Sequence, residues 1–134
     1  MENNWGVPIK PVDLAWIAGF WEGEGSINFY RVKRTRGKKL YKSNRLYATI
    51  TQGDRDILKW AIKTTGVGSI SKQRNNIHNP YGWNSKLIYR YNVSNKAARY
   101  LFPKLLPYIK CSARRRQVIR ALKLDQERIK GRWN

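Results

Sequence analysis

The hydrophobic pattern of this chain changes from helical spacing to strict alternation twice, in the same order each time. Apolar residues three or four apart are typical of an amphipathic helix, and alternation is typical of a half-buried strand. The doubled pattern therefore predicts two helix–strand–strand units. Their segments are residues 14–23, 26–34 and 40–52 in the first unit and 54–65, 68–75 and 85–94 in the second.

Two further helical segments follow, at residues 95–109 and 112–129. We expect Pro103 to interrupt the first and Pro107 to end it, because proline lacks the backbone N–H that a helix interior uses. The predicted order is α-β-β-α-β-β-α-α. This is an α+β fold of the αββαββα kind, with helices on one face of an antiparallel sheet.

Single residues mark the predicted boundaries of these elements. The chain of 134 residues is expected to form one domain, with an N-terminal extension at 1–11 and a basic tail at 126–134. The predicted N-caps are Asp13 and Asp54, the predicted stop of the second helix is Gly66, and the predicted apolar face of the last helix is Val118, Leu122 and Ile129.

The charge of the chain is strongly one-sided. It has 28 Lys and Arg against 8 Asp and Glu, a formal net charge of +20. No acidic residue lies between Glu24 and Asp54, and none lies between Asp56 and Asp125. A solvated surface normally mixes both signs, so long stretches with cations alone favour a polyanionic partner, with double-stranded DNA or another nucleic acid as the first choice.

The scarcity of cysteine and histidine limits the chemistry. Cys111 and His78 are single, which excludes an internal disulfide and an internal Cys/His zinc site. A metal would then be a hard cation held by oxygen atoms, Mg²⁺ or another divalent cation such as Mn²⁺. We see no signal-peptide pattern and no membrane-spanning apolar run, so we expect an intracellular, non-secreted protein without a membrane partner.

Two of the eight acidic residues stand together at the end of the first helical segment, in "GFWEGEGS". A helix C-terminus carries partial negative charge, so Glu22 and Glu24 are unfavourable there unless a cation neutralises them. One interpretation is a divalent metal site beside flexible glycines. The other is surface ion pairing with Lys or Arg, and the spacing by itself does not decide between them.

Small residues recur every fourth position on the same helix, at Ala15, Gly19 and Gly23. Glycine costs about 1 kcal/mol of helix propensity, so the stripe needs a reason. It could serve packing within the monomer, or it could let a second copy of the helix approach across a two-fold axis.

The stretch "IAGFWEGEGSI", residues 17–27, resembles the signature of the LAGLIDADG homing endonucleases, with Glu in place of both Asp. The resemblance continues over residues 12–125 through "TITQ", "GVGSIS", "LLPYIK" and "RRRQVIRAL". A single signature implies a homodimer with a saddle-shaped DNA-binding sheet. The implied activity is metal-dependent cleavage of a long, nearly palindromic site that leaves 3′ overhangs.

The resemblance also implies roles for individual residues. Glu24 matches the acid that binds the metal, the Gly23 carbonyl often adds a ligand, and Gln52 matches a residue that positions the attacking water. Glu22 takes a supporting or structural role. Arg114 matches the basic residue beside the scissile phosphate, with Lys110 in reserve, and the implied dimer interface is Ala15, Ala18, Gly19 and Glu22.

Strand parity suggests which side chains face DNA. Base edges in the major groove are read by polar side chains, and phosphates are bound by cations. The predicted base-reading residues are Asn28, Tyr30, Arg90 and Asn92, and the predicted phosphate contacts are Arg34, Arg36, Lys38 and Lys39.

Other functions stay open at this point. A maturase that binds intron RNA, or a DNA-binding relative that does not cleave, could share the same fold. A small ribosomal or chromatin protein would need the charge but has no use for the paired glutamates. A membrane-surface role fits least, because the cations lie in strands.

Overall fold

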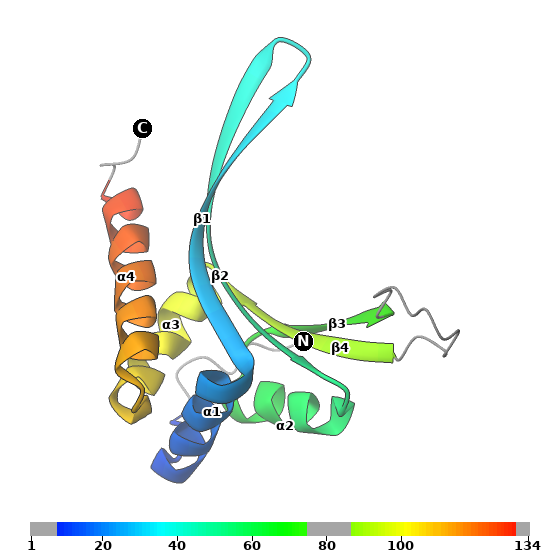
Figure 1. Ribbon diagram of the computed structural model, residues 1–134, viewed down its shortest axis with the longest axis vertical. Coiled ribbons are helices and arrows are strands. Elements are labelled where there is room, and N and C mark those ends of the chain that lie inside the picture. Colours follow the sequence, from blue (N-terminus) through cyan, green and yellow to red (C-terminus); the bar gives the residue numbers. More distant parts are fainter. Residues whose placement is uncertain (1–7, 75–86, 131–134) are drawn as a thin grey trace.

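The computed structural model describes residues 8–74 and 87–130. The chain alternates helices and strand pairs in the predicted order, with one short 3₁₀ turn added before the last helix (Figure 1). The elements are α1 (Pro11–Glu24), β1 (Gly25–Arg36), β2 (Lys39–Gln52), α2 (Arg55–Thr65), β3 (Ser69–Arg74), β4 (Leu87–Ser94), α3 (Lys96–Leu105), η1 (Leu106–Tyr108) and α4 (Ser112–Ile129).

The four strands form one antiparallel sheet in the order β1-β2-β4-β3. Figure 1 shows the helices gathered on one side of this curved sheet and the other side open. The β1–β2 pair extends well past the helices as a long ribbon (Figure 1). The predicted α+β architecture is therefore confirmed.

The core lies between the sheet and the helices. Alternate residues of the central strands point inward, as the period of two requires, and they meet the apolar faces of the helices. The fully buried side chains include Ile27, Leu46, Ile50, Tyr91 and Val93 from the sheet and Ile17, Leu58, Leu101, Phe102 and Leu105 from the helices.

Tyr91 is the polar member of this core. Its hydroxyl donates to the Val67 carbonyl at 2.7 Å and lies 3.0 Å from the Thr65 hydroxyl. Burial raises the pKa of Tyr91 to about 12, because the phenolate would lose its hydration.

The α1–β1 junction is direct, and glycine makes it possible. Gly25 caps α1 in an extended conformation and begins β1 opposite Ile50. A Cβ atom at this position would lie 2.5 Å from the Trp21 ring and 3.0 Å from the Ile50 side chain. The absence of a side chain therefore lets the chain turn from helix to strand without a loop.

α2 begins and ends as predicted. The Asp54 carboxylate accepts a hydrogen bond from the Asp56 amide at 2.9 Å, and Gly66 ends the helix in the left-handed conformation with φ of 74°.

Other boundary predictions are wrong. α1 begins at Pro11 with Lys10 as its N-cap, so Asp13 lies in the first turn and is not the cap. The earlier start is favourable because the first position of a helix does not need the backbone N–H that proline lacks. Pro103 lies inside α3, which continues to Leu105. α4 ends at Ile129 as predicted, but Ile129 is exposed and does not belong to the buried face of the helix.

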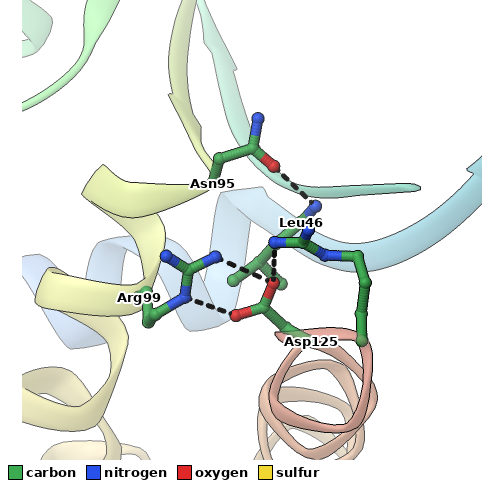
Figure 2. Close-up of polar contacts among 5 residues, drawn as sticks. Leu46, Asn95, Arg99 and Asp125 are labelled. Atoms are coloured by element: carbon green, nitrogen blue, oxygen red, sulfur yellow. Dashed lines mark hydrogen bonds and ion pairs between the residues drawn. The ribbon is translucent and has the colours of Figure 1, made fainter. Parts of the chain in front are cut away.

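A buried carboxylate, Asp125, connects α4 to α3. Asp125 accepts two hydrogen bonds from the Arg99 guanidinium, at 2.6 and 3.0 Å, and lies 3.4 Å from an Arg128 nitrogen (Figure 2). The hydrogen bonds to Asp125 raise the pKa of Arg99. In the same region Asn95 exchanges hydrogen bonds with the Leu46 backbone, which ties the start of α3 to β2.

Candidate nucleic-acid interface and acidic site

The open side of the sheet carries polar side chains. Asn28 pairs with Tyr47, which pairs on its other side with Ser94. In the same way Ser26 pairs with Thr49, which pairs with Asn92. Because neighbours of buried Ile27, Ala48 and Val93 point the other way, these residues face away from the core. The predicted outward placement of Asn28, Tyr30, Arg90 and Asn92 is correct.

Several residues of this face were missed in the sequence. The sequence does carry a signal for those on β2. The apolar residues Leu46, Ala48 and Ile50 alternate there and point inward, so the residues between them point outward. The residues on this face that the prediction omitted are Ser26, Arg45, Tyr47, Thr49, Thr51 and Ser71.

Hydrogen bonds link side chains across this face. The Tyr47 hydroxyl donates to Asn92 Oδ1 at 2.6 Å, and Asn92 Nδ2 donates to Ser71 Oγ at 3.2 Å. Asn28 Nδ2 donates to the Tyr30 hydroxyl at 3.3 Å. The face is therefore partly preorganised before any partner binds.

Cations flank the polar face. Arg36, Lys38 and Lys39 are exposed where β1 turns into β2. The side chain of Arg34 lies outside the part that the structure describes. The Arg45 guanidinium lies 4.4 Å from the centre of the Tyr47 ring. A long basic ribbon of this kind suits phosphate contacts.

Arg90 lies among the polar residues, opposite Thr51 and Ser71. Its Nε is buried and has no acceptor among the described residues. A buried donor without a partner is costly, so an acceptor supplied by a bound molecule would be favoured there.

Glu24 is exposed at the last position of α1, directly before β1. The last turn of α1 contains no basic residue. Since Gly25 pairs with Ile50, Gln52 lies at the same end of the β1–β2 pair as Glu24. Gln52 Oε1 accepts from the Gly53 amide at 2.9 Å, so its Nε2 group is the end that can donate outward.

Glu22 has a different environment. Its Oε1 accepts hydrogen bonds from the backbone amides of Lys110, at 3.1 Å, and Cys111, which is the N-cap of α4. A carboxylate at a helix N-terminus satisfies amides that have no partner within the helix. The Glu22 carboxylate therefore has a structural contact within the protomer. Its place at a dimer interface stays a prediction.

The two candidate cations lie near this junction. Arg114 lines a narrow crevice together with Glu22 and Gly25, and its Nη1 donates to Gln117 Oε1 at 3.1 Å. Lys110 is exposed, and its backbone is held by Glu22. Arg115 has a structural task, because its Nη1 donates to the carbonyls of Leu106 and Ile109.

The acidic site suits a hard cation with incomplete protein ligation. Within residues 8–74 and 87–130, no group of three or more His, Cys, Asp or Glu side chains could hold a metal ion. The candidate oxygen ligands are the Glu24 carboxylate and the backbone carbonyl of Gly23, the preceding residue. Mg²⁺ is commonly bound by one or two carboxylates with water and phosphate, and this donor set fits it.

The small-residue stripe is exposed in the protomer. Ala15, Gly19 and Gly23 face solvent, and a Cβ atom added at either glycine would meet nothing within 4 Å. Internal packing therefore does not require these glycines. Ala18 is fully buried in the core, so its predicted place at the dimer interface is wrong.

No helix of the described residues is long and apolar enough to cross a bilayer. Among curated proteins, nothing matches the chain. The family model for LAGLIDADG endonucleases matches residues 17–117, about three quarters of the sequence.

Solved structures share the fold. The homing endonuclease I-CvuI in complex with its target is 24% identical, with a TM-score of 0.68 over 87% of this chain and 67% of that one. The archaeal intron-encoded I-Vdi141I complexed with DNA is 20% identical, with a TM-score of 0.59 over 90% and 70%. I-SmaMI bound to cleaved DNA is 22% identical, with a TM-score of 0.65 over 89% and 37%.

Proposed function

The chain belongs to the LAGLIDADG endonuclease family, and we propose that it cleaves double-stranded DNA site-specifically as a homodimer. The observation that carries the proposal is the position of Glu24. This exposed carboxylate ends α1 where the polar sheet face begins. A scissile phosphate beside Glu24 would thus belong to a duplex that the sheet also contacts.

The sheet supplies the DNA-binding surface of the proposal. Its outer face presents hydroxyl, amide and guanidinium groups that can reach base edges in a major groove. Arg36, Lys38 and Lys39 at the end of the β1–β2 ribbon are exposed for phosphate contacts. Arg34 is proposed for the same role from the sequence. The net charge of +20 favours fast, salt-dependent association with a polyanion.

The proposed metal site uses oxygen atoms alone. A divalent cation, Mg²⁺ or Mn²⁺, would be held by the Glu24 carboxylate and the Gly23 carbonyl, and when bound it would stabilise negative charge on the phosphate. I-CvuI has been solved on DNA in the presence of Mg and of Ca, which supports the use of such a cation. Glu22 does not take part, because its carboxylate caps α4.

Other residues of the protomer would complete the site. Gln52 can donate through Nε2 to an attacking water or to a phosphate oxygen, because its Oε1 is held by the Gly53 amide. Arg114 would stabilise charge on the phosphate from the crevice beside Gly25, and Lys110 is the alternative cation. The attacking water displaces the 3′ oxygen without a covalent enzyme intermediate.

The homodimer would form through α1. Exposed Ala15, Gly19 and Gly23 allow two copies of the helix to pack closely across a two-fold axis, which brings two Glu24 side chains to one duplex. A two-fold dimer predicts a nearly palindromic site and one cut in each strand. The 3′ overhangs are expected from the family resemblance.

The test is selection of cleaved sequences from a randomised double-stranded DNA library. We expect double-strand cuts with Mg²⁺, none with chelator, and recovered sites with two-fold symmetry. Glu24→Gln should lower the cleavage rate by more than about 100-fold while DNA binding persists. Glu127→Gln on α4 makes the same change of charge outside the site and should leave cleavage intact.

Two results would contradict the proposal. If no DNA is cut with Mg²⁺ or Mn²⁺ while intron RNA is bound tightly, the chain is an RNA maturase. If Glu24→Gln cleaves at the wild-type rate, the acidic site has been assigned wrongly.

A further inference from the structure

A chain of three side chains crosses the open face of the sheet. It runs from Tyr47 on β2 through Asn92 on β4 to Ser71 on β3, with hydrogen bonds of 2.6 and 3.2 Å. All three side chains are half-buried. The contacts join strands that are distant in sequence, so they fix the side chains relative to one another.

The direction of these hydrogen bonds is set by the backbone. Asn92 Nδ2 lies 3.2 Å from the Arg90 carbonyl oxygen. A carbonyl can only accept, so the amide nitrogen must face it and the amide oxygen must face Tyr47. Because that oxygen can only accept as well, the Tyr47 hydroxyl has to be the donor.

This direction decides what each hydroxyl has left to offer. Tyr47 has given its proton to Asn92, so its oxygen retains only acceptor capacity. Ser71 receives a hydrogen bond from Asn92, and its own proton has no acceptor among the described residues. Asn92, which strand parity suggested as a base-reading residue, uses its amide oxygen and its amide nitrogen within the sheet.

We propose that Asn92 is a positioning residue that makes Tyr47 a hydrogen-bond acceptor and Ser71 a hydrogen-bond donor toward DNA bases. The proposal rests on the DNA-binding function proposed above. Tyr47 would select the exocyclic amino group of cytosine or adenine. Ser71 would select an acceptor, either N7 or O6 of guanine, N7 of adenine or O4 of thymine.

The geometry also limits where these bases lie. The two hydrogen bonds and the width of the amide keep the hydroxyl oxygens within roughly 8 Å of each other, and one base step rises about 3.4 Å. Each hydroxyl oxygen reaches a base atom about 3 Å away, so the two selected bases are no more than about four steps apart. The Arg45 guanidinium, 4.4 Å from the Tyr47 ring centre, covers the ring and limits its movement.

The experiment compares binding profiles on a randomised double-stranded DNA library, measured with chelator so that no cleavage occurs. Tyr47→Phe should lose about tenfold discrimination at one position, and Ser71→Ala should do so at a second position close by. Asn92→Leu should lose both together, with the rest of the profile kept. Tyr100→Phe, which removes a hydroxyl on α3, should leave the whole profile unchanged.

One substitution distinguishes positioning from general support of the fold. In Asn92→Asp the carboxylate cannot donate, so the Ser71 hydroxyl turns to donate to it and its oxygen becomes the outward acceptor. The preference at the Ser71 position should then change from a base acceptor to a base amino group. Loss of structure would weaken all positions alike and would not invert one.

The possible outcomes distinguish failure of the positioning role from failure of the proposed DNA-binding function. If the wild-type protein selects no sequence, site-specific binding and the positioning role of Asn92 both fall. If it selects a site, but Tyr47→Phe, Ser71→Ala and Asn92→Asp keep the same preference at every position, the positioning role alone is overturned. Thermal unfolding of each variant establishes that the compared proteins are folded.

Discussion

The carboxylate of Glu22, near the end of α1, accepts a hydrogen bond from the backbone amide of Cys111, the N-cap of α4. The two residues are 89 positions apart in the sequence, and the Lys110 amide donates to the same oxygen. This contact fixes the start of α4, and with it Arg114, against the end of α1. The two glutamates therefore have different environments, because Glu22 is hydrogen-bonded to the backbone before α4 and Glu24 is exposed.

Glu22→Ala should therefore destabilise the protein by about 1 kcal/mol, the usual cost of losing a helix cap. Denaturant unfolding measures this directly. Glu24→Gln is the matched comparison, because Glu24 is exposed and should change stability little. Equal stability of the Glu22 variant and the wild type would show that the cap contributes nothing.

The ion pair between Arg99 and Asp125 should respond unequally to loss of either partner. Asp125 is fully buried, whereas about a third of the Arg99 side chain is exposed. Arg99→Met leaves a buried carboxylate with Arg128 as its remaining ion-pair partner among the described residues, which should cost about 3 kcal/mol. Asp125→Leu leaves arginines that can reach water and should cost less. Denaturant midpoints with matched slopes test the order, and the reverse order would contradict it.

Stability should depend on pH through Tyr91. Its pKa is about 12 in the folded protein against an ordinary value of 10.0, so the folded state holds the proton more tightly. The contribution is complete below pH 10 and is lost as pH rises from 10 to 12, by about 3 kcal/mol in total. Denaturant unfolding between pH 9 and 12 checks this, with Tyr91→Phe as the reference in which this loss should vanish. An identical decline in both proteins would assign it to other groups.

The element order and the faces of the strands could be predicted from the sequence because both follow from local periodicity. Alternation around Ile27, Leu46 and Ile50 predicts which side of each strand is apolar, and it does so without knowledge of the element that packs there. Asp54 and Gly66 mark α2 for a similar reason, since a side-chain cap and a left-handed stop act within a few residues.

What could not be predicted depends on contacts between distant segments. Ala18 belongs to a helix with apolar and small residues on several sides, so its burial is decided by where the sheet lies. The hydrogen-bond partners of Glu22 and Asn92 lie on other segments of the chain, and no local sequence pattern predicts these contacts. The apolar spacing of α4 predicts Ile129 as a core residue, but Ile129 is exposed and Asp125 is fully buried instead.

Gly19 provides a test of the proposed dimer that does not depend on cleavage. A Cβ at this position meets nothing within 4 Å in the protomer, so Gly19→Leu should keep the fold and raise helix propensity by up to about 1 kcal/mol. The larger side chain would hold two α1 helices apart, and the dimer dissociation constant should rise by at least about tenfold. Sedimentation equilibrium measures this constant, and thermal unfolding reports the protomer. Lys123→Leu adds the same side chain on α4 and should leave association unchanged. A Gly19→Leu protein that dimerises as tightly as the wild type would place the interface elsewhere.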